Sequence, residues 1–62
     1  MNKPLSISKI NRIKTGDQIT VSNHPAATWF TIVSIGKFTA EIKEKDLYRS
    51  QFIDKFIICT VR

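Results

Sequence analysis

Hydrophobic and polar residues alternate over two short stretches in the middle of the chain. In residues 18–22, Ile19 and Val21 share one face and the polar residues share the other. In residues 38–43, the apolar members of the alternation are Phe38, Ala40 and Ile42. Side chains of a β-strand point to opposite faces in turn, so a period of two predicts a half-buried strand. Both stretches are therefore expected to be strands with one face against a core.

Two other stretches are apolar on both faces. Residues 29–35 are rich in β-branched and aromatic side chains, which favours a central strand. The turn Gly36-Lys37 separates this stretch from residues 38–43, so the two stretches are expected to form a β-hairpin. Residues 56–61 are almost wholly apolar and predict the last strand, which would lie unpaired at an edge.

The segment before the last strand is open to two interpretations. Residues 46–50 can return as a fourth strand, followed by one turn of 3₁₀ helix over residues 50–55 that places Phe52 or Ile53 in the core. The alternative is a helix over residues 45–56. It is favoured by four side chains that fall near helical spacing, Leu47, Tyr48, Phe52 and Phe56. The first interpretation yields five strands in all.

An isoleucine recurs at every third position near the N-terminus, as Ile7, Ile10 and Ile13. This spacing predicts a short helical or 3₁₀ turn with its apolar side inward, which Ser6 or Ser8 could cap. The alternative is an irregular arm that lies on the β-domain. The segment ends before Gly16, which suits a tight turn. The chain therefore divides into an N-terminal arm, residues 1–14, and a β-domain, residues 15–62.

The β-domain resembles a known class of small barrels. Gly16-Asp17 before the first strand, Trp29 after the next loop, five short strands and a 3₁₀ turn before the last one resemble the SH3-like barrels. These include KOW-type modules and the plasmid-borne type II dihydrofolate reductases. No glycine follows in residues 23–28, as the KOW pattern would have, and the Val-Gln-Ile-Tyr substrate motif of the reductases has no counterpart.

That resemblance covers residues 15–62 and implies an all-β fold, a single five-stranded SH3-like barrel, without implying an activity. A five-stranded OB-like barrel is the structural alternative, although such barrels usually have longer strands and connections. Either barrel brings Trp29 or Phe30 to the outside if their strand is regular. The outward ring is expected to be covered by the N-terminal isoleucines or exposed as a contact surface.

Length and residue usage restrict the class of protein. A chain of 62 residues makes one domain with a small core. A single cysteine, Cys59, excludes an internal disulfide and suits a reducing compartment. No run reaches the roughly 18 apolar residues of a membrane span, and no signal peptide is evident. We therefore expect a cytoplasmic protein with no membrane partner.

The residues that carry chemistry in enzymes are scarce in this chain. One histidine, His24, and one cysteine cannot supply the three or four ligands of a zinc site. Cys59 lies among apolar residues, where a thiol behaves as a small hydrophobe. Gly16 and Gly36 are too far apart to form a glycine-rich phosphate loop. The sequence predicts no catalytic residue, no metal, no cofactor and no enzymatic activity.

Positive charge is concentrated at the N-terminus. The net charge is +5, and the first fourteen residues contain four cations and no acid. Such a segment attracts polyanions, because Coulomb attraction and counterion release both favour contact. Tyr48 could stack on a base while its neighbour Arg49 contacts a phosphate. The residues expected to bind nucleic acid or a nucleoprotein complex are Lys3, Lys9, Arg12, Lys14, Tyr48, Arg49, Lys55 and Arg62.

Two other interpretations stand beside nucleic-acid binding. The basic segment can simply be a solvated end that keeps the protein in solution. The chain can also be a protein-interaction module of a phage, a plasmid or another accessory element. In that case it would dock through the apolar edge Phe56–Val61, because bare edge strands recruit further strands. The same edge would allow a homo-oligomer.

Overall fold

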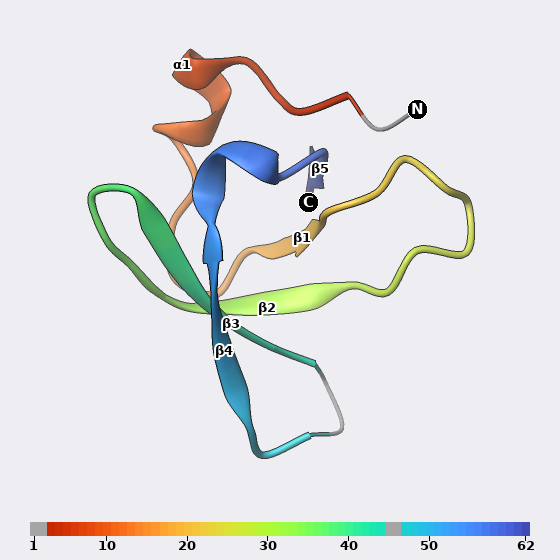
Figure 1. The fold of residues 1–62 in the computed structure, drawn as a ribbon, viewed down its shortest axis with the longest axis vertical. Coiled ribbons are helices and arrows are strands. Elements are labelled where there is room, and N and C mark those ends of the chain that lie inside the picture. Colours follow the sequence, from red (N-terminus) through yellow and green to blue (C-terminus); the bar gives the residue numbers. More distant parts are fainter. Residues whose placement is uncertain (1–2, 45–46) are drawn as a thin grey trace.

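The computed structural model describes residues 3–44 and 47–62 and shows a mostly β fold with little helix. Its five strands form one antiparallel sheet in the order β4-β3-β2-β1-β5 (Figure 1). The strands are β1 (Gln18–Thr20), β2 (Phe30–Ile35), β3 (Thr39–Glu44), β4 (Ser50–Asp54) and β5 (Thr60–Val61). The helices are α1 (Ile7–Ile10) and the 3₁₀ helix η1 (Lys55–Ile57).

The sheet is open, with β4 and β5 at its two edges. In Figure 1, β2 lies across the view whereas β3 and β4 run down it, so the sheet is strongly twisted. A bulge between Ile32 and Ser34 shifts the register of β2 against β3. Bulges of this kind increase the local right-handed twist. Across residues 3–44 and 47–62, neither helix is long and apolar enough to cross a membrane.

The core is built almost entirely from isoleucines on one face of the sheet. Ile19, Ile32 and Ile42 come from β1, β2 and β3 and are at most 1% exposed. The N-terminal segment and the chain before β5 cover them from the other side. Burial of such side chains contributes about 1.5–3 kcal/mol each. The buried apolar residues are Ile10, Ile13, Ile19, Ile32, Ala40, Ile42, Ile58 and Cys59.

The expected N-terminal helical turn is confirmed as α1. The Ser6 hydroxyl caps it by accepting a hydrogen bond from the Lys9 backbone N–H, at 3.4 Å. Ile10 is buried in the core, whereas Ile7, one turn earlier on the same side of the helix, is 66% exposed. Before α1, the Leu5 N–H donates to the Ile58 carbonyl, at 2.8 Å. The N-terminal segment is thereby tied to the chain that leads into β5.

The turn at Gly16 is also confirmed. Gly16 has a φ of 95°, a conformation that costs a residue with a side chain about 1 kcal/mol or more. Its N–H donates to the Ile32 carbonyl at 2.9 Å, and the Ile32 N–H donates to the Asp17 carbonyl at 2.9 Å. This turn therefore sets the register in which β1 meets β2.

The prediction for residues 46–55 is wrong. The fourth strand is Ser50–Asp54, so the segment expected to be a 3₁₀ turn is a strand, and the 3₁₀ helix follows it at Lys55–Ile57. Pairing of β4 with β3 along its whole length overrides the local spacing that favoured a turn or a helix. The alternative helix over residues 45–56 is wrong for the same reason. Its first residues, Lys45 and Asp46, lie outside the described residues.

The last strand is much shorter than expected. Only Thr60–Val61 pairs with β1, and Phe56 and Ile57 belong to η1. The Asp54 carboxylate caps η1 by accepting from the Phe56 N–H at 2.9 Å. Ile58 and Cys59 are apolar because they enter the core, not because they lie in a strand. The predicted edge strand Phe56–Val61 is therefore wrong in extent, and β4 is the longer free edge.

Candidate nucleic-acid interface

Two of the N-terminal cations lie beside the C-terminal strand. Lys9 and Arg12 line a shallow pocket of about 220 Å³ together with Ile13, Asp17 and Val61. Ile13 is buried against the core and holds the segment in place, while Lys9 and Arg12 are exposed at the rim. The pairing of β5 with β1 brings Val61 to this place.

Two further cations adjoin residues of this pocket, Lys14 next to Asp17 and Arg62 next to Val61. The Lys14 N–H donates to the Asp17 carboxylate at 3.0 Å, so Lys14 adjoins the lining. Arg62 follows Val61 and exchanges two backbone hydrogen bonds with Gln18, at 2.9 and 3.2 Å, so its side chain points to the opposite face from that of Val61. We define the basic cluster as Lys9, Arg12, Lys14 and Arg62. With Asp17 the formal charge of this neighbourhood is +3, which is four cations less one carboxylate.

Arg62 also covers the indole of Trp29. Its guanidinium lies 3.9 Å from the ring centroid, and its Nε donates to the Gln18 Oε1 at 2.9 Å. Such a cation–π contact contributes about 0.5–1 kcal/mol at an exposed site. The outward ring at this strand is therefore Trp29, and a C-terminal arginine covers it rather than the N-terminal isoleucines. Phe30 packs against the core.

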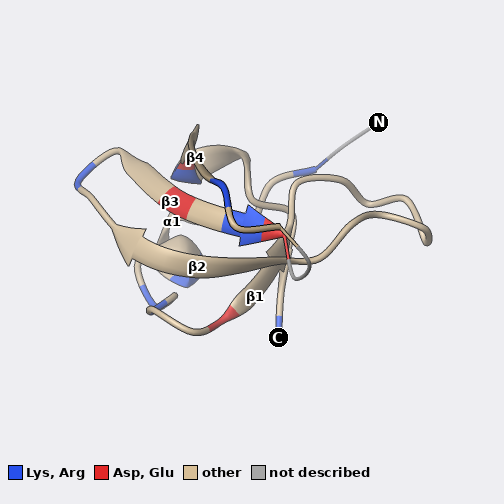
Figure 2. Ribbon diagram, turned by 90° about the horizontal axis from the view of Figure 1, so that it is seen from below, with Lys and Arg blue, Asp and Glu red and all other residues tan. Residues whose placement is uncertain are grey.

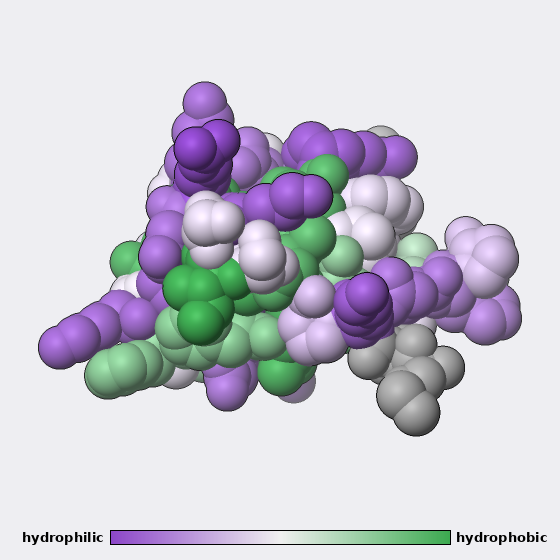
Figure 3. Space-filling view, turned by 90° about the horizontal axis from the view of Figure 1, so that it is seen from above, coloured by the Kyte–Doolittle hydropathy of each residue, from purple (hydrophilic) through white to green (hydrophobic). Residues whose placement is uncertain are grey.

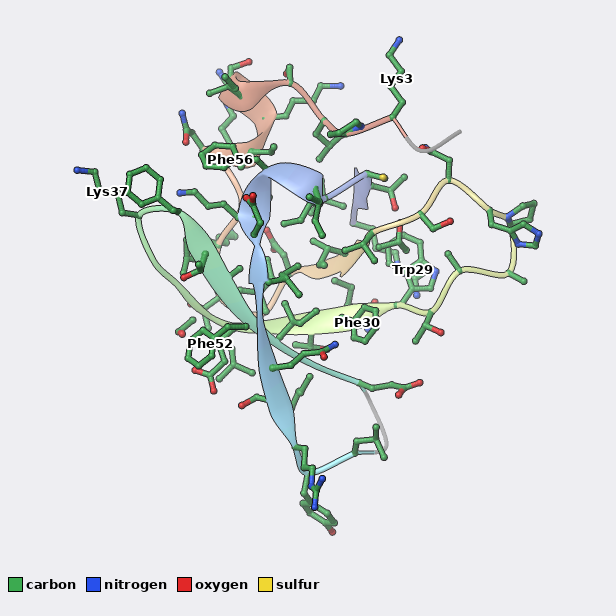
Figure 4. All side chains as sticks on the ribbon, viewed as in Figure 1. Lys3, Trp29, Phe30, Lys37, Phe52 and Phe56 are labelled. Atoms are coloured by element: carbon green, nitrogen blue, oxygen red, sulfur yellow. The ribbon has the colours of Figure 1, made fainter. Side chains whose placement is uncertain are left out.

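Three of the predicted residues lie away from the basic cluster. The Lys3 backbone N–H donates to the Asn23 side chain at 2.6 Å, and Figure 4 shows Lys3 near the N-terminal end of the chain. Tyr48 and Arg49 belong to the β3–β4 connection, which Figure 1 places at the end of the molecule opposite α1. The Tyr48 side chain is fully exposed. The structure thus separates these three residues from the basic cluster.

Lys55 is buried and has a structural role instead of lying on the surface. It is 8% exposed, and its Nζ donates to the Gly36 carbonyl at 3.1 Å. The Nζ also lies 5.6 Å from the centroid of the Phe56 ring. Buried ammonium groups need such partners, because desolvation of an unpaired charge is costly. Lys55 therefore holds the β2–β3 hairpin against η1 and takes no part in the candidate interface.

A second shallow pocket lies beside the β3–β4 connection. It measures about 220 Å³, and its charged lining is mixed, with Lys43 and Arg49 against Glu44. Phe30 and Leu47 supply apolar surface. Charges of both signs leave little net attraction for an anion, so this pocket is a weaker candidate than the basic cluster.

Charged residues are spread over the molecule. Figure 2 shows positive residues before β1, at the C-terminus, at the β2–β3 turn and at the end of β3, with acidic positions near the start of β1 and within β3. Within residues 3–44 and 47–62, no group of His, Cys, Asp and Glu side chains could hold a metal ion. Sequence reasoning missed Lys43 and Phe52, which the sheet presents on its outside. The alternation in residues 38–43 already placed Lys43 on the face opposite the apolar residues. Residues 50–54 lack a comparable alternation, so the sequence did not predict the outward position of Phe52.

Comparison of the chain with protein-family models, with characterised proteins and with solved structures found no match.

Proposed function

We propose that this chain is a small non-enzymatic binding domain that contacts nucleic acid, or a nucleoprotein complex, through the basic cluster. The observation that carries this proposal is the pocket at which Lys9 and Arg12 meet Val61, whose neighbour Arg62 adds a further cation on the adjoining face. These residues come from opposite ends of the chain, and only the β1–β5 pairing unites them. Cations gathered around one edge of a small protein attract phosphates more strongly than the same charges dispersed.

We also propose an SH3-like barrel as the fold class. Five antiparallel strands in one twisted sheet and a 3₁₀ helix directly before the last strand support it. Closure would bring the free edge of β4 toward the β5 side of the sheet. Small barrels of this kind present rims and loops to ligands while their interiors are filled by side chains.

A salt titration tests the nucleic-acid proposal. We expect a labelled oligonucleotide to bind at about 50 mM salt, with a logarithmic salt slope between about −2.8 and −3.6 for four phosphate contacts. Raising the salt fourfold, to about 200 mM, should then weaken binding about 50- to 150-fold. Fluorescence anisotropy measures both. Absence of binding at the low salt concentration, or a slope near zero, contradicts the proposal.

A second candidate function rests on exposed apolar surface at α1 and η1. Figure 3 views the molecule from the α1 side and shows apolar atoms within a hydrophilic surround. Ile7 of α1 is 66% exposed and Ile57 of η1 is 44% exposed, and the two helices contact each other. Contiguous apolar surface of this kind is typical of protein–protein contacts. As the second candidate, we propose that the chain associates with a second copy of itself through this surface.

Light scattering after size-exclusion chromatography tests the second candidate. We expect a mass near 14.2 kDa, which is twice the 7.1 kDa of one chain. Charge introduced by the double substitution Ile7→Lys and Ile57→Lys should restore the mass of a single chain, because each lysine would be desolvated in the contact. The matched control is Val33→Lys, at a side chain of β2 that is 37% exposed. A wild-type protein that stays at 7.1 kDa at high concentration contradicts self-association.

A further inference from the structure

A row of polar side chains crosses the face of the sheet that points away from the core. Cross-strand partners in an antiparallel sheet point to the same face. Gln18 pairs with Thr31, and Thr31 pairs with Lys43. Lys43 in turn pairs with Ser50, at the edge strand β4. At the other end, Arg62 pairs with Gln18 through two backbone hydrogen bonds. We name this set the outer row: Arg62, Gln18, Thr31, Lys43 and Ser50.

The outer row faces solvent and carries positive charge. The residues between its members, such as Ile19 and Ile32, are at most 1% exposed and point into the core. Figure 2 looks onto the outside of β1, β2 and β3, with α1 behind them. Arg62 and Lys43 are both exposed, and none of the five side chains is a carboxylate. On the same face of β3, Glu41 lies opposite Phe52, and its carboxylate accepts hydrogen bonds from serine hydroxyls on both neighbouring strands.

An aromatic side chain lies on each side of the outer row. Phe52 is two residues beyond Ser50 in β4 and is 71% exposed. Trp29 is two residues before Thr31, with the Arg62 guanidinium over its ring. Figure 4 shows Trp29 and Phe52 at opposite ends of β2. From the rise of about 3.3 Å per residue and the strand spacing of about 4.8 Å, the two rings are on the order of 20 Å apart.

Resting on the proposed function, we propose that the outer row binds single-stranded nucleic acid. The phosphates follow Arg62 and Lys43, and the unpaired bases stack on the Phe52 ring and on the free face of the Arg62 guanidinium. Aromatic rings and guanidinium planes both stack bases, and stacking accepts any sequence. The distance between the two platforms suits a short strand, at the lower end of the 4–16 nucleotides, roughly, that small barrels cover.

Duplex nucleic acid fits this face poorly. Its bases are stacked on one another, so the Phe52 ring could reach only the backbone. The major groove is read by an α-helix or a β-ribbon that enters it. Helix α1 has only four residues and lies on the other side of the sheet. We therefore expect the outer row to prefer single strands to duplexes, because only unpaired bases can stack on the Phe52 ring.

Fluorescence anisotropy with a labelled single strand of about 12 nucleotides and with the matching duplex tests this inference. We expect the single strand to bind at least about ten times more tightly at equal salt, and its binding to change the emission of Trp29, the one tryptophan of the chain. Phe52→Ala should weaken single-strand binding about 5- to 150-fold, the range for loss of one stacked base.

Phe38→Ala is the matched control, because Phe38 is 62% exposed in the β2–β3 hairpin and lies away from the outer row. Lys43→Ala and its control Lys37→Ala repeat the comparison for charge, and circular dichroism verifies that each variant is folded. If both forms bind but the duplex binds as tightly, or if Phe52→Ala stays within about twofold of the wild type, this inference is overturned and the proposed function stands. If neither form binds at low salt, both are overturned.

Discussion

The Ile42→Ala variant is expected to be largely unfolded at physiological temperature. Ile42 is fully buried in β3, where it pairs with Ile32 of β2 on one side and with β4 on the other. Truncation of such a side chain to alanine costs about 2–5 kcal/mol, because the removed atoms leave a cavity that the surroundings fill only in part. A domain of 62 residues has about 3–9 kcal/mol of stability in total.

Thermal unfolding followed by far-UV circular dichroism measures this loss. We expect the Tm of Ile42→Ala to fall by at least about 10 °C. Ile7→Ala is the matched control, since it makes the same chemical change at a side chain that is 66% exposed, and its Tm should stay within about 3 °C of the wild type. Equal losses at the two positions would contradict the assignment of Ile42 to the centre of the core.

Reversal of charge at Arg12 and Arg62 together is expected to weaken binding of nucleic acid about 100-fold or more. The double substitution Arg12→Glu and Arg62→Glu changes the formal charge around the pocket from +3 to −1. Two lost charge-assisted contacts of about 1.5 kcal/mol each already correspond to about two decades in Kd. Repulsion between the new carboxylates and the phosphates adds to this loss.

The matched control reverses the same number of charges elsewhere. Lys37→Glu combined with Arg49→Glu changes the net charge equally, at the β2–β3 hairpin and the β3–β4 connection. We expect this control to bind within about tenfold of the wild type, since distant charges act only through a screened field. Equal weakening of the two double variants, measured by anisotropy at one salt concentration, would show that net charge alone decides binding.

Local patterning was sufficient for the central part of the fold. The alternation in residues 18–22 and 38–43 and the β-branched run in residues 29–35 predicted β1, β2 and β3 to within a few residues. These three strands are neighbours along the chain, so the turns between them determine their pairing. The helical turn at Ile7–Ile10 and its Ser6 cap were also predicted, because both depend on adjacent residues alone.

The same reasoning failed where the partner is distant in sequence. Residues 50–54 have no clean alternation, since polar Gln51 lies on the same face as Ile42 and apolar Phe52 on the opposite face. They become a strand because β3 supplies an edge to pair with. The run Phe56–Val61 is apolar because Ile58 and Cys59 are buried in the core, and only its last two residues form a strand. A short apolar run has the same composition in either case, so periodicity cannot separate the two.

For the candidate interface too, some features followed from the sequence and others only from the tertiary structure. The sequence alone determined that positive charge is concentrated before Gly16, and it led us to expect neither a metal site nor a catalytic site. Only the tertiary structure decided that Lys55 is buried beneath the hairpin, that Val61 lies beside Lys9 and Arg12, and that Arg62 covers the ring of Trp29. Net charge depends on composition alone and can be counted directly from the sequence. The neighbours of a charge depend on strand pairing across some forty residues, and that pairing is settled by burial of the isoleucine core.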